Sequence, residues 1–547
     1  MISTSELAFI QRLSRATIVL AAAATVLSSF AQTPPALGQV PAGPGQAPAP
    51  AGQNPAGRAG GGGPAGRGGR GGGGGQMLNP APRAIFPDAK PVRTPESLSK
   101  VEIPNTTIQS VDVADGSVNV LAVVTHPPTG DRVQVWISLP ETNWNGRFLG
   151  TGGGGWSGGG GGRGGAMVQQ GFVTGGTDTG HTGGSGNFAL DAKGNLAWQL
   201  IRDNAHQGIH DMTVVGKALT AAYFGKAPKY SYFSGFSTGG RQALSEAQRY
   251  PEDYDGVLSG APAINWHRFI IAELWPQVVM NATGNRVPAA KLRGATQAFI
   301  AAADEADGVK DGVVEDPQRV AFDPKVLVGT EVGGSPFTEA DADVVRKIWE
   351  GPRAKDGSFL WYGLTKSADL GSLAGAQPFG ISIAWVRYFL TKDPTWNISK
   401  MTLDEFDRLY LIAVQDFGEV FGTNNPDLTK FRDRGGKVII THGQSDNLIM
   451  TEGTIDYYKQ VMDNMGGRDA TMKFARLFLI PAQGHSAAPI AATEALIRWV
   501  EEGVAPDKLI NPAAGRTRPL FPYPELAKYK GTGSTDDAAN FESMMPR

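Results

Sequence analysis

Ser237 stands in a sequence pattern that can expose a nucleophilic serine. Residues 235–239 read GFSTG, a Gly-x-Ser-x-Gly pattern in a chain of 547 residues with 74 glycines. The aromatic residues before it favour a buried strand, and residues 241–249 after it are good helix formers. A sharp strand-to-helix turn presents the serine hydroxyl beside the first N–H groups of the helix. Chance matches are frequent in a glycine-rich chain, so the strand and helix around Ser237 carry its interpretation as a catalytic serine.

A serine hydroxyl is a weak nucleophile at neutral pH, so it needs a base, and the base needs a carboxylate that holds its tautomer. Asp446 and His485 can supply both, and each follows a run that is predicted to be a strand. The chain order serine, aspartate, histidine on loops after strands is that of an α/β-hydrolase fold. We therefore expect Ser237, Asp446 and His485 to meet at one edge of a sheet. The three predicted strands are residues 230–233, 436–442 and 473–480.

A second glycine-rich stretch, residues 150–165, follows another strand-like run upstream of the serine. Backbone N–H groups can approach a substrate carbonyl where no side chains intervene, as an oxyanion hole requires. We interpret residues 152–155 in this way and residues 158–165 as a flexible low-complexity insert.

Three aspartates, Asp304, Asp307 and Asp311, lie in a short loop with Asp-Gly turns. Carboxylates spaced in this way can wrap around one hard cation, with backbone carbonyls completing its shell. The spacing is not that of an EF-hand, and a solvated acidic turn explains the same residues. On these residues alone both interpretations stay open.

Three further histidines need an interpretation. His206 and His210 lie one turn apart in a helix predicted over residues 203–222, a spacing that can bind a metal ion. No third ligand is evident, so local hydrogen bonds are the preferred explanation. His442 ends a predicted strand beside the loop of Asp446, and we interpret it as structural.

The elements that position these residues alternate between strands and helices, which predicts an α/β fold with a doubly wound sheet. Residues 266–427 are mostly helical in pattern, with scattered aromatic residues, and are long enough to form a lid domain inserted between strands. The hydrolase core is then expected over residues 83–265 and 428–547. Further strands are predicted at residues 106–113, 118–125, 133–139, 147–149, 172–177 and 257–262, and a closing helix at 491–502.

The first 31 residues have the pattern of a secretory signal peptide. Arg12 and Arg15 precede an apolar run, residues 16–27, and small residues lead to a predicted cleavage after Ala31. The run is short for a membrane span of about 20 residues. We expect a secreted or periplasmic protein without stable membrane insertion after cleavage, an uncleaved anchor being the alternative.

The amino-acid composition predicts one disordered segment and argues against several classes of partner and site. Residues 32–82 are almost entirely Gly, Pro, Ala, Gln and Arg, which predicts a disordered tether. Charged residues make up 19% of the chain and the net charge is -2, so no nucleic-acid partner is indicated. The chain has no cysteine, which excludes disulfides, thiolate metal sites and a cysteine nucleophile.

The motifs together resemble the tannase/feruloyl esterase family of α/β-hydrolases, over roughly residues 87–499. The resemblance implies that Ser237 is the nucleophile, His485 the base and Asp446 its orienting acid. It implies an oxyanion hole formed by the N–H of Thr238 and the glycine loop around Gly153 and Gly154. The matching segments are residues 144–148, 178–181, 232–242, 250–262, 304–313, 435–443 with Asp446, and 484–485.

The resemblance also implies a calcium ion in the lid loop and no organic cofactor. Its ligands would be the side chains of Asp304, Asp307 and Asp311 and the carbonyls of Val309 and Val313. One departure stands out: family members usually carry bridged cysteines just before the serine and just after the histidine. This chain has Phe236 and Ser486 there, so packing alone must hold the two loops together.

The activity implied is that of a serine esterase. The expected substrate is a small ester of an aromatic acid, such as a feruloyl, galloyl or terephthalate ester, cleaved through an acyl-enzyme on Ser237. A hydrolase of aliphatic esters, lactones or peptide bonds would share every motif. A non-catalytic protein that binds phenolic compounds or glycans is the alternative from another class.

Overall fold

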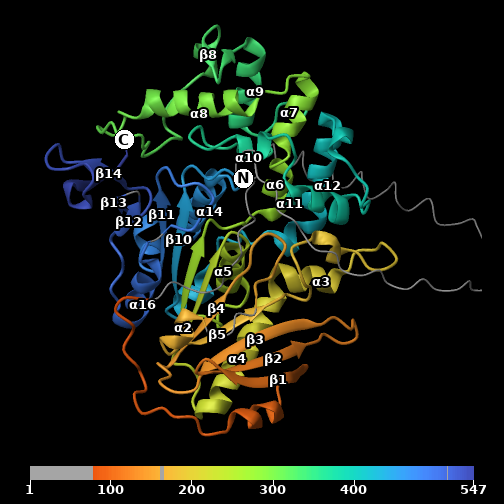
Figure 1. Cartoon of the computed structure of the whole chain (residues 1–547), viewed down its shortest axis with the longest axis vertical. Coiled ribbons are helices and arrows are strands. Elements are labelled where there is room, and N and C mark those ends of the chain that lie inside the picture. Colours follow the sequence, from red (N-terminus) through yellow and green to blue (C-terminus); the bar gives the residue numbers. More distant parts are fainter. Residues whose placement is uncertain (1–77, 161–164, 489, 514, 547) are drawn as a thin grey trace, which may run out of the picture. The chain divides into compact units, whose positions relative to one another are not determined.

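A nine-stranded sheet runs through the computed structural model, which describes residues 78–160, 165–488, 490–513 and 515–546 (Figure 1). Its strands lie in the order β1-β2-β3-β5-β4-β6-β7-β10-β11. From β5 to β11 neighbouring strands run parallel, whereas β1, β2 and β3 form an antiparallel edge that also pairs antiparallel with β5. The strands are β1 (Thr106–Ala114), β2 (Ser117–Val124), β3 (Val133–Pro140), β4 (Arg147–Thr151), β5 (Val173–Thr177), β6 (Tyr230–Phe236), β7 (Gly256–Gly260), β10 (Lys437–Gly443) and β11 (Ala475–Ile480).

Every strand-like run expected from the sequence is a strand of this sheet, with bounds that shift by only a few residues. The α/β-hydrolase type of fold is therefore confirmed. The expected signal peptide, residues 1–31, and all but the last five residues of the expected tether, residues 32–82, lie outside the described residues.

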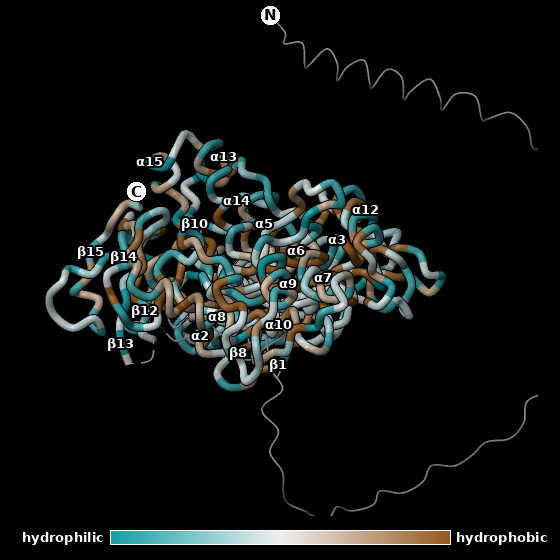
Figure 2. Tube along the Cα trace, turned by 90° about the horizontal axis from the view of Figure 1, so that it is seen from above, coloured by the Kyte–Doolittle hydropathy of each residue, from teal (hydrophilic) through white to brown (hydrophobic). Residues whose placement is uncertain are grey.

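Both faces of the sheet are covered, because successive side chains of a strand point to opposite sides. In β6, Phe233 belongs to a hydrophobic cluster with α4 (Gly208–Phe224), α5 (Thr238–Arg249) and α14 (Thr451–Asn464). Its neighbour Tyr232 belongs to a second cluster with α2 (Ala166–Gln169) and α16 (Ala492–Glu502). Brown hydrophobic stretches accordingly gather in the middle of the trace in Figure 2, and teal hydrophilic ones along its outer loops.

Between β7 and β10 the chain is mainly helical, as expected for residues 266–427, and its helices gather at one end of the sheet (Figure 1). A hydrophobic cluster rich in tryptophan and phenylalanine fills this region. Its elements are α6 (Trp266–Ala272), α7 (Trp275–Thr283), α8 (Ala289–Ala303), η4 (Pro324–Leu327), β8 (Glu331–Val332), β9 (Ser335–Pro336), α9 (Glu339–Glu350), α10 (Gly371–Ala374), α11 (Gly380–Ala384), η5 (Trp385–Leu390), η6 (Ile398–Lys400) and α12 (Leu403–Phe421).

Two parts of the chain differ from the expectation. The helix expected over residues 203–222 is interrupted: α3 (Trp198–Arg202) leads into a π-helical turn, η3 (Asp203–Gln207), before α4 begins. Beyond α16 the chain forms two small hairpins that were not predicted, β12 (Leu509–Ala513) with β13 (Arg516–Leu520), and β14 (Leu526–Tyr529) with β15 (Phe541–Met544). The remaining short elements are η1 (Pro95–Lys100), η2 (Gly186–Ala189), α13 (Thr429–Asp433), α15 (Arg468–Thr471) and η7 (Ala538–Asn540).

A search of the described residues for a membrane-spanning helix gives none: every helix there is too short or too polar to cross a bilayer.

An ion pair joins an early strand to a late helix. The Arg147 guanidinium on β4 donates to both carboxylate oxygens of Glu501 on α16, at 2.7 and 2.6 Å, and the Tyr232 hydroxyl donates to Glu501 Oε1 at 2.7 Å. Arg147 is only 3% exposed. Removing one partner of such a pair leaves a buried charge without compensation.

We therefore expect Glu501→Gln to lower the free energy of unfolding by about 3 kcal/mol, measured by urea denaturation. Glu502→Gln is the matched control, because its pair with Arg498 is exposed on both sides and should contribute less than about 0.5 kcal/mol. Equal losses in the two variants would contradict the role given to Glu501.

Candidate active site

Ser237 is the single residue between β6 and α5, and its backbone has φ 61° and ψ −119°. A non-glycine residue in this region is strained and persists only where its surroundings hold it. The Ser237 N–H donates to Gly260 O at 2.8 Å, and Ser237 O accepts from the N–H of Ala263 at 3.1 Å. The end of β7 and the loop after it therefore hold the turn on both sides of the serine.

Two glycines explain why the turn has its sequence. A Cβ on Gly235 would lie 2.2 Å from Gly239 O, and one on Gly240 would lie 2.4 Å from Gly260 O. Because these neighbours are backbone atoms, they cannot move aside as a flexible side chain can. Gly235 of the pattern and Gly240 just after it thus allow β6, α5 and the end of β7 to approach closely at the serine.

The structure brings Ser237, His485 and Asp446 together. His485 Nε2 lies 3.1 Å from Ser237 Oγ, and His485 Nδ1 lies 2.8 Å from Asp446 Oδ2. The serine follows β6, the aspartate follows β10 and the histidine follows β11. The strands β6, β7, β10 and β11 are consecutive and parallel in the sheet. The carboxyl ends of β6, β10 and β11 therefore lie at the same edge. The imidazole can therefore exchange a proton with the serine while the carboxylate fixes its tautomer.

Asp446 is buried and strongly hydrogen-bonded. Its Oδ1 accepts from the N–H groups of Leu448 and Ile449, each at 2.9 Å. Its Oδ2 also lies 3.2 Å from Nε2 of His442, whose Nδ1 lies 2.9 Å from Thr454 Oγ1. Burial alone would raise the pKa of Asp446, but the contacts with His442 and His485 outweigh it and the pKa falls below its ordinary value. The carboxylate thus stays ionised, with an imidazole on each side.

The contact between His442 and Asp446 was not recognised from the sequence, which indicated only a structural histidine. The signal was present, because His442 ends β10 and Asp446 follows it by four residues.

The predicted oxyanion donors divide into two kinds. No hydrogen bond within the described residues uses the N–H of Thr238, the first residue of α5. By contrast, the N–H of Gly153 donates to Gln242 Oε1 at 2.9 Å, and that of Gly154 donates to Ser157 O at 3.2 Å. Two of the three expected donors are therefore already engaged in this structure.

Gly155 is the residue of the glycine loop whose N–H is free to serve as an oxyanion donor in the described part of the chain. In residues 152–155, its N–H alone has no hydrogen-bond partner in the described part of the chain, since Gly152 donates to Ser234 O. The Thr238 hydroxyl donates to Gly155 O at 2.7 Å, which holds this part of the loop against the start of α5.

Trp156, the residue after Gly155, is held by hydrogen bonds and by aromatic packing. Its carbonyl accepts from His181 Nε2 at 2.7 Å and from the side-chain amide of Asn204 at 3.1 Å. Trp156 is 1% exposed, and its indole packs against Phe188 of η2 and against four aromatic side chains of the helical region between β7 and β10. Those four are Trp266, Trp385, Phe389 and Phe421.

Comparisons with known proteins agree with this geometry. The family described as tannase and feruloyl esterase matches residues 118–544. The chain belongs to the tannase and feruloyl esterase family. It is therefore a carboxylic ester hydrolase with an α/β-hydrolase fold.

Individual members of the family share most of the chain. A protein named "Probable feruloyl esterase" from Arthroderma benhamiae is 39% identical over 82% of this chain and 87% of its own. The crystal structure of feruloyl esterase B from Aspergillus oryzae has a TM-score of 0.72 and 27% identity, covering 81% of this chain and 98% of its own. Tannin acyl hydrolase from Aspergillus niger has a TM-score of 0.74 at 24% identity, covering 83% and 95%, and shows the same fold.

Phe236 and Ser486 stand at the two positions where the resemblance implies bridged cysteines in other family members. The Phe236 ring lies against the His485 imidazole, with ring centroids 5.0 Å apart. The His485 N–H donates to Asn447 Oδ1 at 3.0 Å, and the Ser445 N–H donates to Gln483 O at 3.0 Å. An aromatic contact and hydrogen bonds thus connect the histidine loop to its neighbours.

His206 and His210 do not share a ligand position. His206 Nδ1 lies 2.8 Å from the Tyr250 hydroxyl, and His210 Nδ1 lies 2.6 Å from Asp253 Oδ2. Burial lowers the pKa of His206 to about 3, so it stays neutral. Each histidine thus makes a local hydrogen bond of the kind that we preferred as its explanation.

The aspartate loop places its carboxylates in turns of its own backbone. Asp304 Oδ1 accepts from the N–H groups of Asp311 and Gly312, at 3.1 and 2.6 Å, and Asp307 Oδ1 accepts from that of Val309 at 2.9 Å. Asp307 Oδ2 is buried without a partner among the described residues. Burial, and then the charges of Asp311 and Asp304, raise the pKa of Asp307 to about 6. Oxygen donors and an unpaired buried carboxylate oxygen are what a calcium ion takes, but the carboxylates of Asp304, Asp307 and Asp311 do not all lie within 4.8 Å of one another in this structure.

One neighbour of this loop was not predicted. Asp311 Oδ2 makes ion pairs with Arg516, at 3.1 Å, and with Arg518. Both arginines lie on β13, so the C-terminal hairpin supplies positive charge to one side of the loop.

Proposed function

We propose that this chain hydrolyses small esters of aromatic acids through a covalent acyl-enzyme on Ser237. The observation that carries the proposal is the imidazole of His485, which lies within hydrogen-bonding distance of Ser237 Oγ and of Asp446 Oδ2 at once. Asp446 is buried and kept ionised, so it can hold the Nδ1–H tautomer and stabilise the imidazolium that forms.

In the acylation step, His485 Nε2 takes the proton of Ser237 as Oγ attacks the ester carbonyl carbon. The carbonyl oxygen becomes an oxyanion, which the N–H groups of Thr238 and Gly155 stabilise in this proposal. His485 then gives its proton to the leaving alcohol oxygen as the ester C–O bond breaks. A water molecule, deprotonated by His485, attacks the acyl-enzyme, and return of the proton to Ser237 Oγ releases the acid.

The aromatic acyl group is inferred from the relatives. The similar proteins from Arthroderma benhamiae and Aspergillus oryzae are named feruloyl esterases, and the Aspergillus niger structure is named a tannin acyl hydrolase. These names support feruloyl, galloyl or related aromatic esters as the substrate class. The coarser statement, a carboxylic ester hydrolase, follows from the family itself.

Ser237→Ala is expected to lower ester hydrolysis by at least about 10⁴-fold while the fold stays intact by circular dichroism. Ser486→Ala, next to His485 but exposed, is the control and should retain activity. The assay compares methyl ferulate, methyl gallate and a short aliphatic ester. A covalent boronic acid adduct of Ser237, seen by crystallography, should direct its oxygen to the N–H groups of Thr238 and Gly155.

Each alternative has its own outcome in this assay. Aryl-ester turnover by Ser237→Ala would exclude the site, and faster turnover of the aliphatic ester would exclude the aromatic preference. A wild-type protein that neither turns over any ester nor reacts with a fluorophosphonate would be a non-catalytic binding protein.

We also propose that Asp304, Asp307 and Asp311, with the carbonyls of Val309 and Val313, hold a calcium ion. The support is the oxygen-only donor set and the unpaired buried oxygen of Asp307. When bound, the ion would neutralise the clustered carboxylates and stiffen the loop; it has no part in the ester chemistry.

Removal of calcium with a chelator is expected to lower the melting temperature by about 3–6 °C, measured by differential scanning fluorimetry. Asp307→Asn should melt at the same temperature with or without calcium. Glu305→Gln, in the same loop but exposed and paired with Lys310, should keep the full calcium response. A response in Asp307→Asn equal to that of the wild type would refute this site.

Export is proposed from the N-terminal sequence. Residues 1–31 combine two arginines, a short apolar run and small residues before Ala31, as a cleavable secretory signal does. N-terminal sequencing of the protein recovered outside the cytoplasm of a bacterial host should begin at Gln32. Recovery only in the cytoplasm, with the N-terminus intact, would contradict this.

A further inference from the structure

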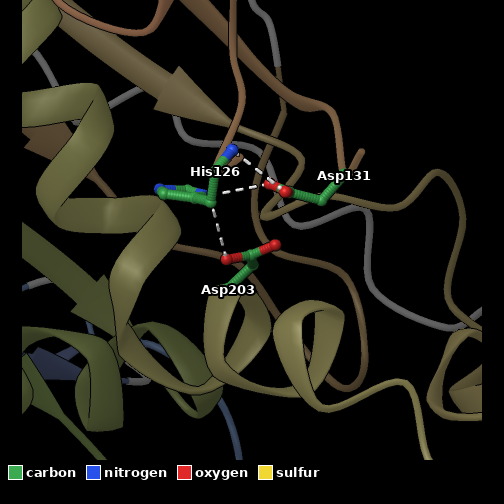
Figure 3. Close-up of side chains that lie close together, drawn as sticks. All are labelled: His126, Asp131 and Asp203. Atoms are coloured by element: carbon green, nitrogen blue, oxygen red, sulfur yellow. Dashed lines mark hydrogen bonds and ion pairs between the residues drawn. The ribbon is translucent and has the colours of Figure 1, made fainter. Parts of the chain in front are cut away.

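Three acidic side chains surround His126 at a place remote in sequence from the catalytic residues. His126 follows β2, Asp131 precedes β3, Asp203 begins the π-helical turn η3, and Asp211 lies on α4. Figure 3 shows the carboxylates of Asp131 and Asp203 facing His126. For His126, Asp131 and Asp203, one ligand atom from each lies within 4.8 Å of the other two.

The charges of this cluster are buried and lack an ordinary counter-ion. Asp203 is 0% exposed and Asp131 6% exposed. Within the described ranges, no lysine or arginine forms an ion pair with Asp131, Asp203 or Asp211; each of these pairs only with His126. Burying three carboxylates is costly unless a cation lies among them.

The two nitrogens of His126 have different surroundings. Nδ1 faces two carboxylates, with Asp131 Oδ2 at 2.7 Å and Asp203 Oδ1 at 3.7 Å. Nε2 faces one, with Asp211 Oδ2 at 3.3 Å. A histidine that binds a metal through one nitrogen usually donates its other N–H to a carboxylate, which fixes the tautomer. In this structure Nδ1 is hydrogen-bonded to Asp131 Oδ2, whereas Asp211 Oδ2 has no hydrogen-bond partner within the described residues. If Nε2, on the side of Asp211, carried the proton instead, the unprotonated Nδ1 would face Asp131 and Asp203.

Neighbouring groups orient both of those carboxylates. Asp131 Oδ1 accepts from the N–H of His126 at 3.0 Å and from the Thr129 hydroxyl at 2.6 Å, which leaves Oδ2 for the centre of the cluster. Asp203 Oδ1 accepts from Gln199 Nε2 at 2.7 Å. Asp203 Oδ2 is buried, with no hydrogen-bond partner in the part of the chain that the structure describes.

We propose that His126 Nδ1, Asp131 and Asp203 bind a divalent transition-metal ion, with zinc as the best match, and that Asp211 orients the histidine. One imidazole nitrogen with carboxylate oxygens suits zinc better than calcium, which takes oxygen ligands. Ligands about 2.1 Å from a tetrahedral zinc lie roughly 3.4 Å apart. Asp131 Oδ2, at 2.7 Å from Nδ1, would have to move outward to share the ion, and Asp203 Oδ1, at 3.7 Å, would have to move slightly inward. A water molecule would complete the shell, and the partly exposed edge of His126 leaves a path for entry.

The position of the site gives it a structural role. Asn204, next to Asp203, donates to the carbonyl of Trp156 at 3.1 Å, and Ala205 O accepts from Arg241 at 2.7 Å. A metal that clamps Asp203 to the β2–β3 connection would therefore fix the turn that supports the glycine loop.

A proton is the competitor of the metal. With no ion present, hydrogen bonds to Asp211 and Asp131 outweigh burial and raise the pKa of His126 to about 9. An imidazolium would then balance the carboxylates, and the cluster would bind no metal.

The test measures zinc binding by the full chain with calcium in excess, so that other oxygen sites are occupied. After dialysis, inductively coupled plasma mass spectrometry gives the zinc content, and titration against a competing chelator gives the affinity. His126→Gln, Asp131→Asn and Asp203→Asn should each weaken zinc binding by about 100-fold or more. His210→Gln is the matched control, because the one ion pair of His210 within the described residues is with Asp253, outside the cluster, and this variant should bind zinc within about twofold of the wild type.

X-ray absorption at the zinc edge should then show mixed nitrogen and oxygen ligands in the wild type. Zinc binding by His126→Gln as tight as that of the wild type would overturn the proposal. A wild-type protein that binds no more zinc than His126→Gln does would overturn it as well. The remaining explanation of the cluster would then be a protonated His126 that balances the carboxylates. Three single variants, each judged by circular dichroism, keep the test informative if one of them fails to fold.

Discussion

The backbone at Ser237 is the constraint on which the active site depends. A serine with φ 61° is held in a conformation that costs about 1–3 kcal/mol, so its neighbours must supply that energy. They do so with backbone hydrogen bonds to Gly260 and from Ala263, and with a Gly239 N–H that donates to Gly153 O at 2.9 Å. The turn, the loop after β7 and the glycine loop therefore hold one another, and the hydroxyl reaches His485 only because all three meet.

Much of the fold could be predicted because each strand of the large sheet has a recognisable pattern in its own residues. Alternating residues such as Tyr232 and Phe233 pack on opposite faces of the sheet, and this period of two is visible in the sequence. The π-helical turn at Asp203–Gln207 has no such period, and one of its contacts, the hydrogen bond from Arg241 to Ala205 O, comes from far along the chain. The C-terminal hairpins were missed because their strands are short and two of them contain proline.

The candidate site also has a part that the sequence predicts and a part that it does not. Ser237, Asp446 and His485 follow strands that could be read from the sequence, so their meeting was predictable from the order of the sheet. Which N–H groups of the glycine loop are engaged was not, because the partner of Gly153 is Gln242 on another element. The carboxylates around His126 come from a turn and from a distant helix, and no local spacing joins them.

Trp156 has a mechanical consequence for how substrate enters. Its carbonyl belongs to the hydrolase core, through His181 and Asn204, while its indole is embedded among aromatic rings of the inserted helices. A hinged swing of those helices away from the sheet would extract the indole and drag the adjacent Gly155 out of place. We therefore expect an ester to enter through small side-chain rearrangements, without a hinged opening of the covering helices.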